Sequence, residues 1–141
     1  MNYELAKQLK DAGFPQRYGQ TFPNADFAYK IGEEELHLIH EDNDTNWRIG
    51  NDYSHSEMSD EEMEKNWIKV PTLSELIEAC GNGFHGLFKD YLYDSPQTFK
   101  WAAGLIEGED FRAYLDKTRP FGIGSTPEEA VAHLWLMLNK K

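Results

Sequence analysis

The chain has 141 residues, of which 25 are Asp or Glu and 14 are Lys or Arg, so its formal net charge is -11. This balance disfavours direct binding to nucleic acid or anionic lipid, whose phosphates it would repel. The single cysteine excludes an internal disulfide, no window approaches the roughly 18 apolar residues of a membrane span, and the amino terminus has no apolar signal segment. We therefore expect a cytoplasmic protein without membrane contact, folded as a single domain over residues 1–141.

The amino-terminal part of the chain predicts a helix followed by a hairpin. A helix over residues 3–12 is indicated by apolar residues spaced along one face, with Asn2 as its N-cap. Gly13 followed by Phe14 is typical of a Schellman ending. Alternating apolar and polar residues then predict a β-hairpin over about 26–40.

Residues 33–64 concentrate the negative charge. They contain 12 of the 25 acidic residues, and Arg48 is the only Lys or Arg among them. We interpret this segment either as a solvated face with a long loop or as an acidic surface offered to a basic protein partner. Within it, the spacing of Ser59 and Glu62 is that of a capping box and predicts a short helix at 60–67. The partner-facing surface is assigned to six carboxylates: Glu33, Glu34, Glu35, Glu61, Glu62 and Glu64.

The second half of the chain predicts two more helices with strands between them. A capping box of Thr72 and Glu75 starts a helix at 72–80, which Gly81 ends. Aromatic and aliphatic segments separated by turn residues predict three strands between about 84 and 117. The last helix, at 127–139, is nearly apolar all round. It is expected to be a central buried helix or a homo-oligomer interface.

The stretch FGIGSTPEE at 121–129 is the segment most similar to a phosphate-binding loop, because a glycine-rich turn there approaches a helix N-terminus. Thr126 already caps that helix, and Pro127 suits its first position. Glu128 and Glu129 would repel a bound phosphate, and the lysine of a P-loop is absent. We therefore interpret the stretch as a helix start.

Metal and cofactor sites are not indicated. His37, His40, Asp42 and Asp44 are residue types that can hold a divalent cation, but positions 37 and 40 of a strand face opposite sides. The Asp-x-Asp-x-Asn run also fails the EF-hand pattern, which requires Gly where Trp47 stands. We expect no metal and no cofactor.

Catalytic residues are not indicated either. Cys80 and His85 could be a nucleophile and a base, but Cys80 continues the apolar face of its helix and is predicted to be a core residue. A ligand-binding site cannot be assigned from the sequence. One possibility is a pocket in which aromatic residues meet basic ones, such as Arg112, Lys117 or Arg119.

Three segments resemble a group of small uncharacterised proteins of bacteria, prophages and phages. They are YELAKQLKDAGFPQ at 3–16, VPTLSELIEACG at 70–81 and TPEEAVAHLWLMLN at 126–139. The resemblance implies a setting in phage or mobile DNA. It implies no activity and carries over no functional residue.

These observations predict an α+β fold, in which an antiparallel sheet of about four or five strands is covered on one face by the helices at 3–12, 72–80 and 127–139. The alternating order of the elements leaves a mixed sheet as the alternative. The leading hypothesis for function is a non-enzymatic, phage-type binding protein that acts on a host protein. The alternative is a protein that binds or sequesters a small, nucleotide-like ligand. The third possibility is an enzyme whose site forms from residues far apart in the sequence.

Overall fold

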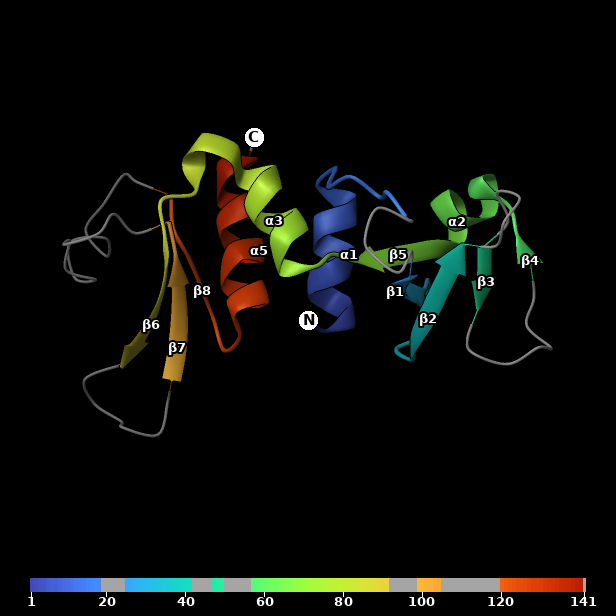
Figure 1. The fold of residues 1–141 in the computed structure, drawn as a ribbon, viewed down its shortest axis with the longest axis horizontal. Helices are drawn as coiled ribbons and strands as arrows, with labels where there is room; N and C mark the ends of the chain where they lie inside the picture. The colour runs from blue at the N-terminus through green and yellow to red at the C-terminus, as the bar shows by residue number, and fades with distance from the viewer. Residues whose placement is uncertain (19–24, 42–46, 50–56, 92–98, 105–119, 141) are drawn as a thin grey trace. The chain divides into compact units, whose positions relative to one another are not determined.

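The computed structural model describes residues 1–18, 25–41, 47–49, 57–91, 99–104 and 120–140 (Figure 1). The fold is α+β, which confirms the predicted class. The sequence predicted one sheet, but the described residues form two antiparallel sheets. Each sheet has its own set of helices packed against it. The chain divides into two compact units, Asn2–Pro71 and Thr72–Lys141. The single-domain assignment stays a prediction.

The sheet of the amino-terminal unit has the order β4-β3-β2-β1-β5 within the described residues, and all its neighbouring strands are antiparallel. The predicted hairpin is confirmed by the pairing of β1 with β2. Besides the hairpin strand β2, two strands lie in the acidic segment, whose sequence is typical of a solvated face and long loop. A further strand begins at Trp67, the last residue of the helix predicted at 60–67. These short strands have too few residues to show a period of two. The strands are β1 (Ala25–Lys30), β2 (Leu36–Glu41), β3 (Trp47–Ile49), β4 (Glu57–Met58) and β5 (Trp67–Val70).

One face of this sheet is covered by α2 (Asp60–Asn66) and by Tyr18. The N-cap of α2 is Ser59, whose hydroxyl accepts a hydrogen bond from the Glu62 amide at 3.2 Å. Directly opposed residues of neighbouring strands share a face, so one core collects alternate residues of several strands. This core comprises Tyr18, Ala28, Ile39, Trp47, Met58, Met63 and Trp67.

The helix α1 (Tyr3–Asp11) packs against part of the opposite face. Its apolar stripe, including Leu5 and Leu9, is buried. The predicted N-cap is confirmed, since Asn2 Oδ1 accepts a hydrogen bond from Leu5 N at 2.9 Å. The Schellman ending is also confirmed: Gly13 has φ 93°, and Phe14 N donates to Leu9 O at 2.8 Å. The helix end therefore turns the chain toward β5.

β5 is an edge strand in the described part of the sheet, and side chains cover its outer side. Lys10 Nζ donates to the carbonyl oxygen of Trp67 at 2.5 Å. Gln16 Oε1 accepts from the backbone amide of Lys69 at 2.8 Å. These two contacts satisfy backbone groups that a further strand would otherwise pair with.

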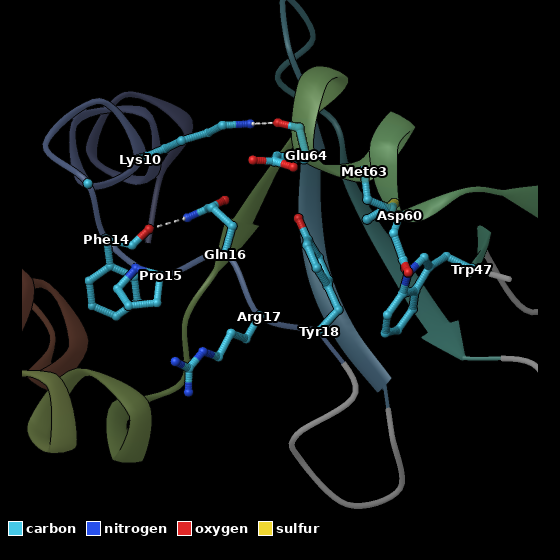
Figure 2. Close-up of a pocket in the computed structure, with 11 residues that line it drawn as sticks. Lys10, Phe14, Pro15, Gln16, Arg17, Tyr18, Trp47, Asp60, Met63 and Glu64 are labelled. Carbon is cyan, nitrogen blue, oxygen red and sulfur yellow. Dashed lines mark hydrogen bonds between the residues drawn. The ribbon is translucent and has the colours of Figure 1, made fainter. Parts of the chain in front are cut away.

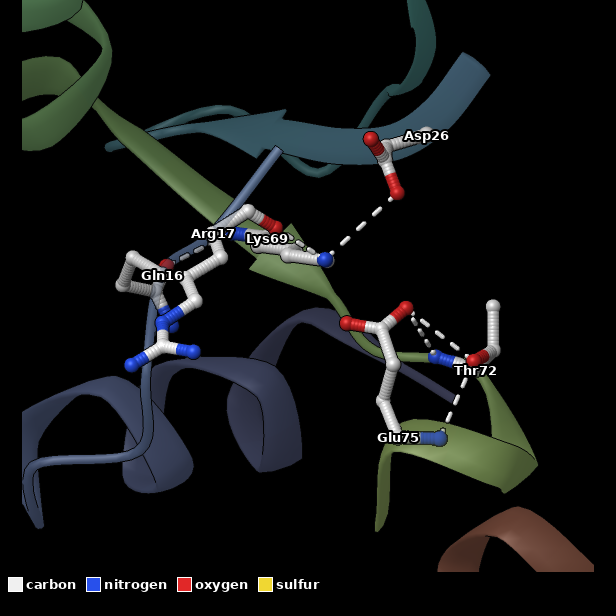
Figure 3. Close-up of polar contacts among 6 residues, drawn as sticks. All are labelled: Gln16, Arg17, Asp26, Lys69, Thr72 and Glu75. Atoms are coloured by element: carbon white, nitrogen blue, oxygen red, sulfur yellow. Dashed lines mark hydrogen bonds and ion pairs between the residues drawn. The ribbon is translucent and has the colours of Figure 1, made fainter. Parts of the chain in front are cut away.

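The carboxy-terminal unit has the strand order β6-β7-β8 within its described residues. β6 (Leu87–Tyr91) and β7 (Phe99–Ala103) are two of the three strands predicted there; the segment predicted for the third lies outside the described residues. The helix α5 (Pro127–Leu138) packs against this sheet, and α3 (Leu73–Cys80) packs against α5 (Figure 1). A short 3-10 helix (Gly81–Gly83) follows α3. The capping box at the start of α3 is confirmed, with Thr72 and Glu75 bonded in both directions (Figure 3).

The glycine-rich stretch before α5 is a strand, β8 (Gly122–Gly124), and not the turn that the sequence predicted. A Cβ on Gly122 would lie 2.0 Å from the carbonyl oxygen of Ala130 in α5, and one on Gly124 would lie 2.6 Å from the amide nitrogen of the same residue. The glycines are therefore explained by the close approach of strand and helix, with no phosphate required. The predicted cap is confirmed, because Thr126 Oγ1 accepts from Glu129 N at 3.2 Å.

The last helix has most of its apolar surface inside the fold. Ala130, Val131, Leu134 and Trp135 are buried, whereas Met137 is 47% exposed. This agrees with the interpretation as a buried helix. A homo-oligomer interface on the same helix stays a prediction.

Candidate binding surfaces

The six carboxylates assigned to the partner-facing surface lie in two segments of the amino-terminal unit, and all six are exposed. Glu33, Glu34 and Glu35 form the connection between β1 and β2. The other three lie on α2. The amide of Ile31 donates to the carbonyl of Asn66 at 2.8 Å, so this connection begins beside the end of α2. The structure thus joins the start of one predicted segment to the end of the helix that carries the other.

The charges of the two segments differ in their surroundings. On α2, Glu61 pairs with Lys65 at 3.2 Å, one turn along the helix, and both side chains are largely exposed. Such exposed pairs contribute little to stability, and they reduce the local negative charge. At the hairpin, Glu34 acts on Tyr29: burial raises the pKa of that tyrosine, and the Glu34 charge raises it further. The charge of Glu34 therefore acts on an aromatic side chain of the sheet.

Exposed apolar side chains lie beside the hairpin carboxylates. Phe27 is 50% exposed, Ile31 45% and Leu36 46%. Phe27 is opposite Leu38 in the β1–β2 register, and Leu36 is opposite Tyr29, so all four share the sheet face that α1 covers in part. The strand alternation in the sequence did not show which of the two faces would be covered better. We call Phe27, Ile31 and Leu36 together with Glu33, Glu34 and Glu35 the hairpin surface.

A groove of about 650 Å³ lies in the amino-terminal unit, between the segment after α1 and the helix α2 (Figure 2). It combines aromatic rings with charges of both signs. Trp47 Nε1 donates to Asp60 Oδ1 at 2.6 Å, which holds the indole against one wall. The lining residues are Lys10, Gly13, Phe14, Pro15, Gln16, Arg17, Tyr18, Trp47, Asp60, Met63 and Glu64.

Tyr18 contributes a buried hydroxyl to the lining of this groove. The residue is 9% exposed, and its hydroxyl has no hydrogen-bond partner among the described residues. Figure 2 shows that hydroxyl pointing toward Gln16 and Glu64. Burial, with a smaller contribution from the charge of Asp26, raises the pKa of Tyr18, so the hydroxyl keeps its proton at neutral pH. A buried hydroxyl without a partner is a place where a ligand or water can bind.

Beneath the groove lies a buried ion pair that the sequence did not reveal. Lys69 Nζ is 3.5 Å from Asp26 Oδ1, and it also donates to the carbonyl of Arg17 (Figure 3). The ammonium lies 5.7 Å from the centre of the Tyr18 ring. Because Lys69 is fully buried, its amine has no route to a substrate, and we assign it a structural role.

The metal-ligand candidates are not brought together. His37 is opposite Ala28 and His40 opposite Ala25, so the two rings belong to opposite faces, as the sequence indicated. Asp42 and Asp44 lie outside the described residues. Over the part of the chain that is described, no three His, Cys, Asp or Glu side chains gather as metal ligands.

Cys80 is a core residue. Its thiol is buried and lies 3.9 Å from the carbonyl oxygen of Val131. Burial raises the pKa of Cys80 to about 11, which is the opposite of what a nucleophile requires. The basic candidates Arg112, Lys117 and Arg119 lie outside the described residues.

None of the described helices has the length and apolar character needed to cross a membrane. Comparison of the chain with protein-family models, with curated proteins and with solved structures gives no match.

Proposed function

We propose that this chain is a non-enzymatic interaction protein of phage or prophage type, which binds a basic surface of a host protein through its acidic segment. The observation that supports this is the exposure of all six carboxylates, which lie in two segments of the amino-terminal unit that the Ile31–Asn66 hydrogen bond connects. Clustered like charges raise the local potential, and an interspersed arrangement would repel itself less. Such a cluster mainly accelerates the encounter with an oppositely charged partner and orients it.

The test is a comparison of association rates among variants with the same net charge. Proteins captured from a bacterial lysate by cross-linking are purified, and their association is followed by stopped flow. The hairpin variant Glu33→Lys/Glu34→Lys and the helix variant Glu62→Lys/Glu64→Lys should associate more slowly than the parent. Raising the salt concentration should slow the parent toward the same rate, because it screens exposed charges.

A matched control comes from the carboxy-terminal unit. Glu78→Lys/Glu128→Lys changes the net charge equally but leaves the acidic segment intact, so its association rate should stay close to that of the parent. Equal rates for all variants at low salt would contradict the proposal. Capture of only acidic or neutral partners would contradict it as well.

A second candidate function is the binding of a small aromatic, nucleotide-like ligand in the groove. It is supported by the unpartnered hydroxyl of Tyr18 between aromatic walls. The carboxylates of Asp60 and Glu64 in the same lining oppose a phosphate, so this candidate ranks second. Titration with AMP, followed by the fluorescence of the parent and of Tyr18→Phe, tests it. An unchanged signal in the parent would exclude nucleotide binding.

A further inference from the structure

The hairpin surface combines two features that each act on a partner. Phe27 and Leu36 are large apolar residues of regular strands, yet each is about half exposed. Glu33, Glu34 and Glu35 follow one another in the connection between those strands and are exposed as well. Apolar side chains rimmed by charge are typical of a protein interaction site, whereas single exposed apolar residues are ordinary.

The apolar part of this surface is the region that α1 leaves uncovered. The ring of Tyr3 in α1 contacts Tyr29 edge-on, with 5.6 Å between the ring centres, and the Tyr3 hydroxyl accepts a hydrogen bond from Gly32 N at 2.9 Å. Phe27 lies two residues further along β1 on the same face, and its cross-strand neighbours are Leu38 and Val70. Both neighbours are only partly buried, so the surface continues across three strands.

We infer that the hairpin surface binds a partner segment in which apolar side chains are flanked by Lys or Arg. This inference rests on the proposed function. It adds contact between apolar side chains to the recognition of opposite charge. A purely apolar segment would take the exposed carboxylates out of water without a counter-charge, and an acidic one would be repelled. The basic end of the bound segment lies at the turn, because Glu33, Glu34 and Glu35 are exposed there.

A second copy of this chain fits less well as the occupant. Its formal charge of -11 opposes self-association at low salt. Sedimentation of the chain alone measures its self-association directly. A dimer that disappears in Phe27→Ser/Leu36→Ser would show that the surface binds another copy, and would overturn the inference.

The experiment uses three synthetic peptides of equal length: one of Leu and Lys, one in which Ser replaces Leu, and one in which Glu replaces Lys. Binding to the full chain is measured by fluorescence anisotropy. We expect the parent to bind the Leu–Lys peptide about tenfold more tightly than the Ser–Lys peptide, and the Leu–Glu peptide not at all. In Phe27→Ser/Leu36→Ser this preference should disappear. Met137→Ser, which alters an exposed apolar residue of the carboxy-terminal unit, should keep it.

The outcomes separate this inference from the proposed function. If Glu33→Lys/Glu34→Lys weakens binding of both basic peptides while Phe27→Ser/Leu36→Ser keeps the tenfold preference, charge recognition stands and the apolar site is wrong. If Glu33→Lys/Glu34→Lys binds both peptides as the parent does, the inference is overturned, and if Glu62→Lys/Glu64→Lys also does so, the proposed function fails. Should Phe27→Ser/Leu36→Ser not fold, radical footprinting of the parent replaces it. Protection of Phe27 by the Leu–Lys peptide but not by the Ser–Lys peptide supports the inference, and equal protection overturns it.

Discussion

Lys69 and Asp26 form an ion pair within the amino-terminal unit, with 3.5 Å between Nζ and Oδ1 and at most 1% exposure of either side chain. Removing one partner leaves an uncompensated buried charge, which usually costs about 3–5 kcal/mol. Lys69→Met should therefore lower the free energy of unfolding by about that amount. The double variant Lys69→Met/Asp26→Leu should recover much of the loss, because no buried charge remains. Urea unfolding of the parent, both single variants and the double variant measures the coupling; additive losses would contradict it.

The close approach of β8 to α5 makes a second prediction. In Gly122→Ala the new methyl group meets backbone atoms of α5, which cannot move aside, so a loss of about 1–3 kcal/mol or more is expected. Gly83→Ala is a suitable control. Its methyl group would lie 2.5 Å from Leu138 Cδ1, the end of a flexible side chain that can rotate away. Thermal unfolding should show a much larger decrease in melting temperature for Gly122→Ala; equal decreases would contradict the explanation.

The thiol of Cys80 should be unreactive in the folded protein. With its pKa raised to about 11 by burial, the thiolate fraction at pH 8 is on the order of one in a thousand. Reaction with Ellman's reagent should therefore be slow in buffer and fast in denaturing urea. Fast reaction under native conditions would show that the thiol is accessible and would reopen the question of a catalytic role.

The start of α5 predicts a pH dependence of stability. Glu129 Oε2 accepts hydrogen bonds from the Ser125 hydroxyl at 2.7 Å and the Ser125 amide at 3.1 Å, and the hydroxyl contact is the largest cause of the lowered pKa of Glu129. A lowered folded-state pKa stabilises the fold above the unfolded pKa, and this contribution is lost as the pH falls through the folded value. Ser125→Ala should therefore reduce stability near neutral pH and bring little change in strong acid.

The N-cap of the same helix gives the control for that experiment. Thr126→Ala removes a hydroxyl that does not titrate, so it should cost about 1 kcal/mol across the whole acid range. Melting temperatures of the parent and both variants from neutral to acidic pH distinguish the two patterns. Parallel curves for Ser125→Ala and the parent would show that the contact with Glu129 does not affect the pH dependence.

The helices could be predicted from the sequence because their signals are local. Thr72 and Thr126 lie three residues from the groups they bond, and Gly13 ends its helix through its own backbone conformation. The strand β8 was missed because its glycines are explained by α5, which begins only after it. No local pattern distinguishes a glycine that faces a helix from a glycine in a turn.

The candidate site could be predicted only in part. The exposed carboxylates follow from charge segregation along the chain. The groove requires Tyr18, Trp47 and Glu64, which the fold brings together from separate segments. Lys69 stands in a short strand where an outward-facing lysine is the ordinary expectation, and its partner Asp26 belongs to a different strand. Burial of this kind depends on contacts between segments far apart in the sequence.

Lys10 and Gln16, which cover the outer side of β5, precede this strand in the chain. Lys10 and Gln16 leave the ribosome more than fifty residues before Trp67 and Lys69, so the cover exists before the strand it protects. A nascent chain can therefore close this edge as soon as β5 emerges from the ribosome. If the first residues are deleted, or held away by a bulky fusion, β5 keeps unpaired backbone groups that can recruit strands of other chains. The amino-terminal segment is therefore expected to limit aggregation of the nascent chain.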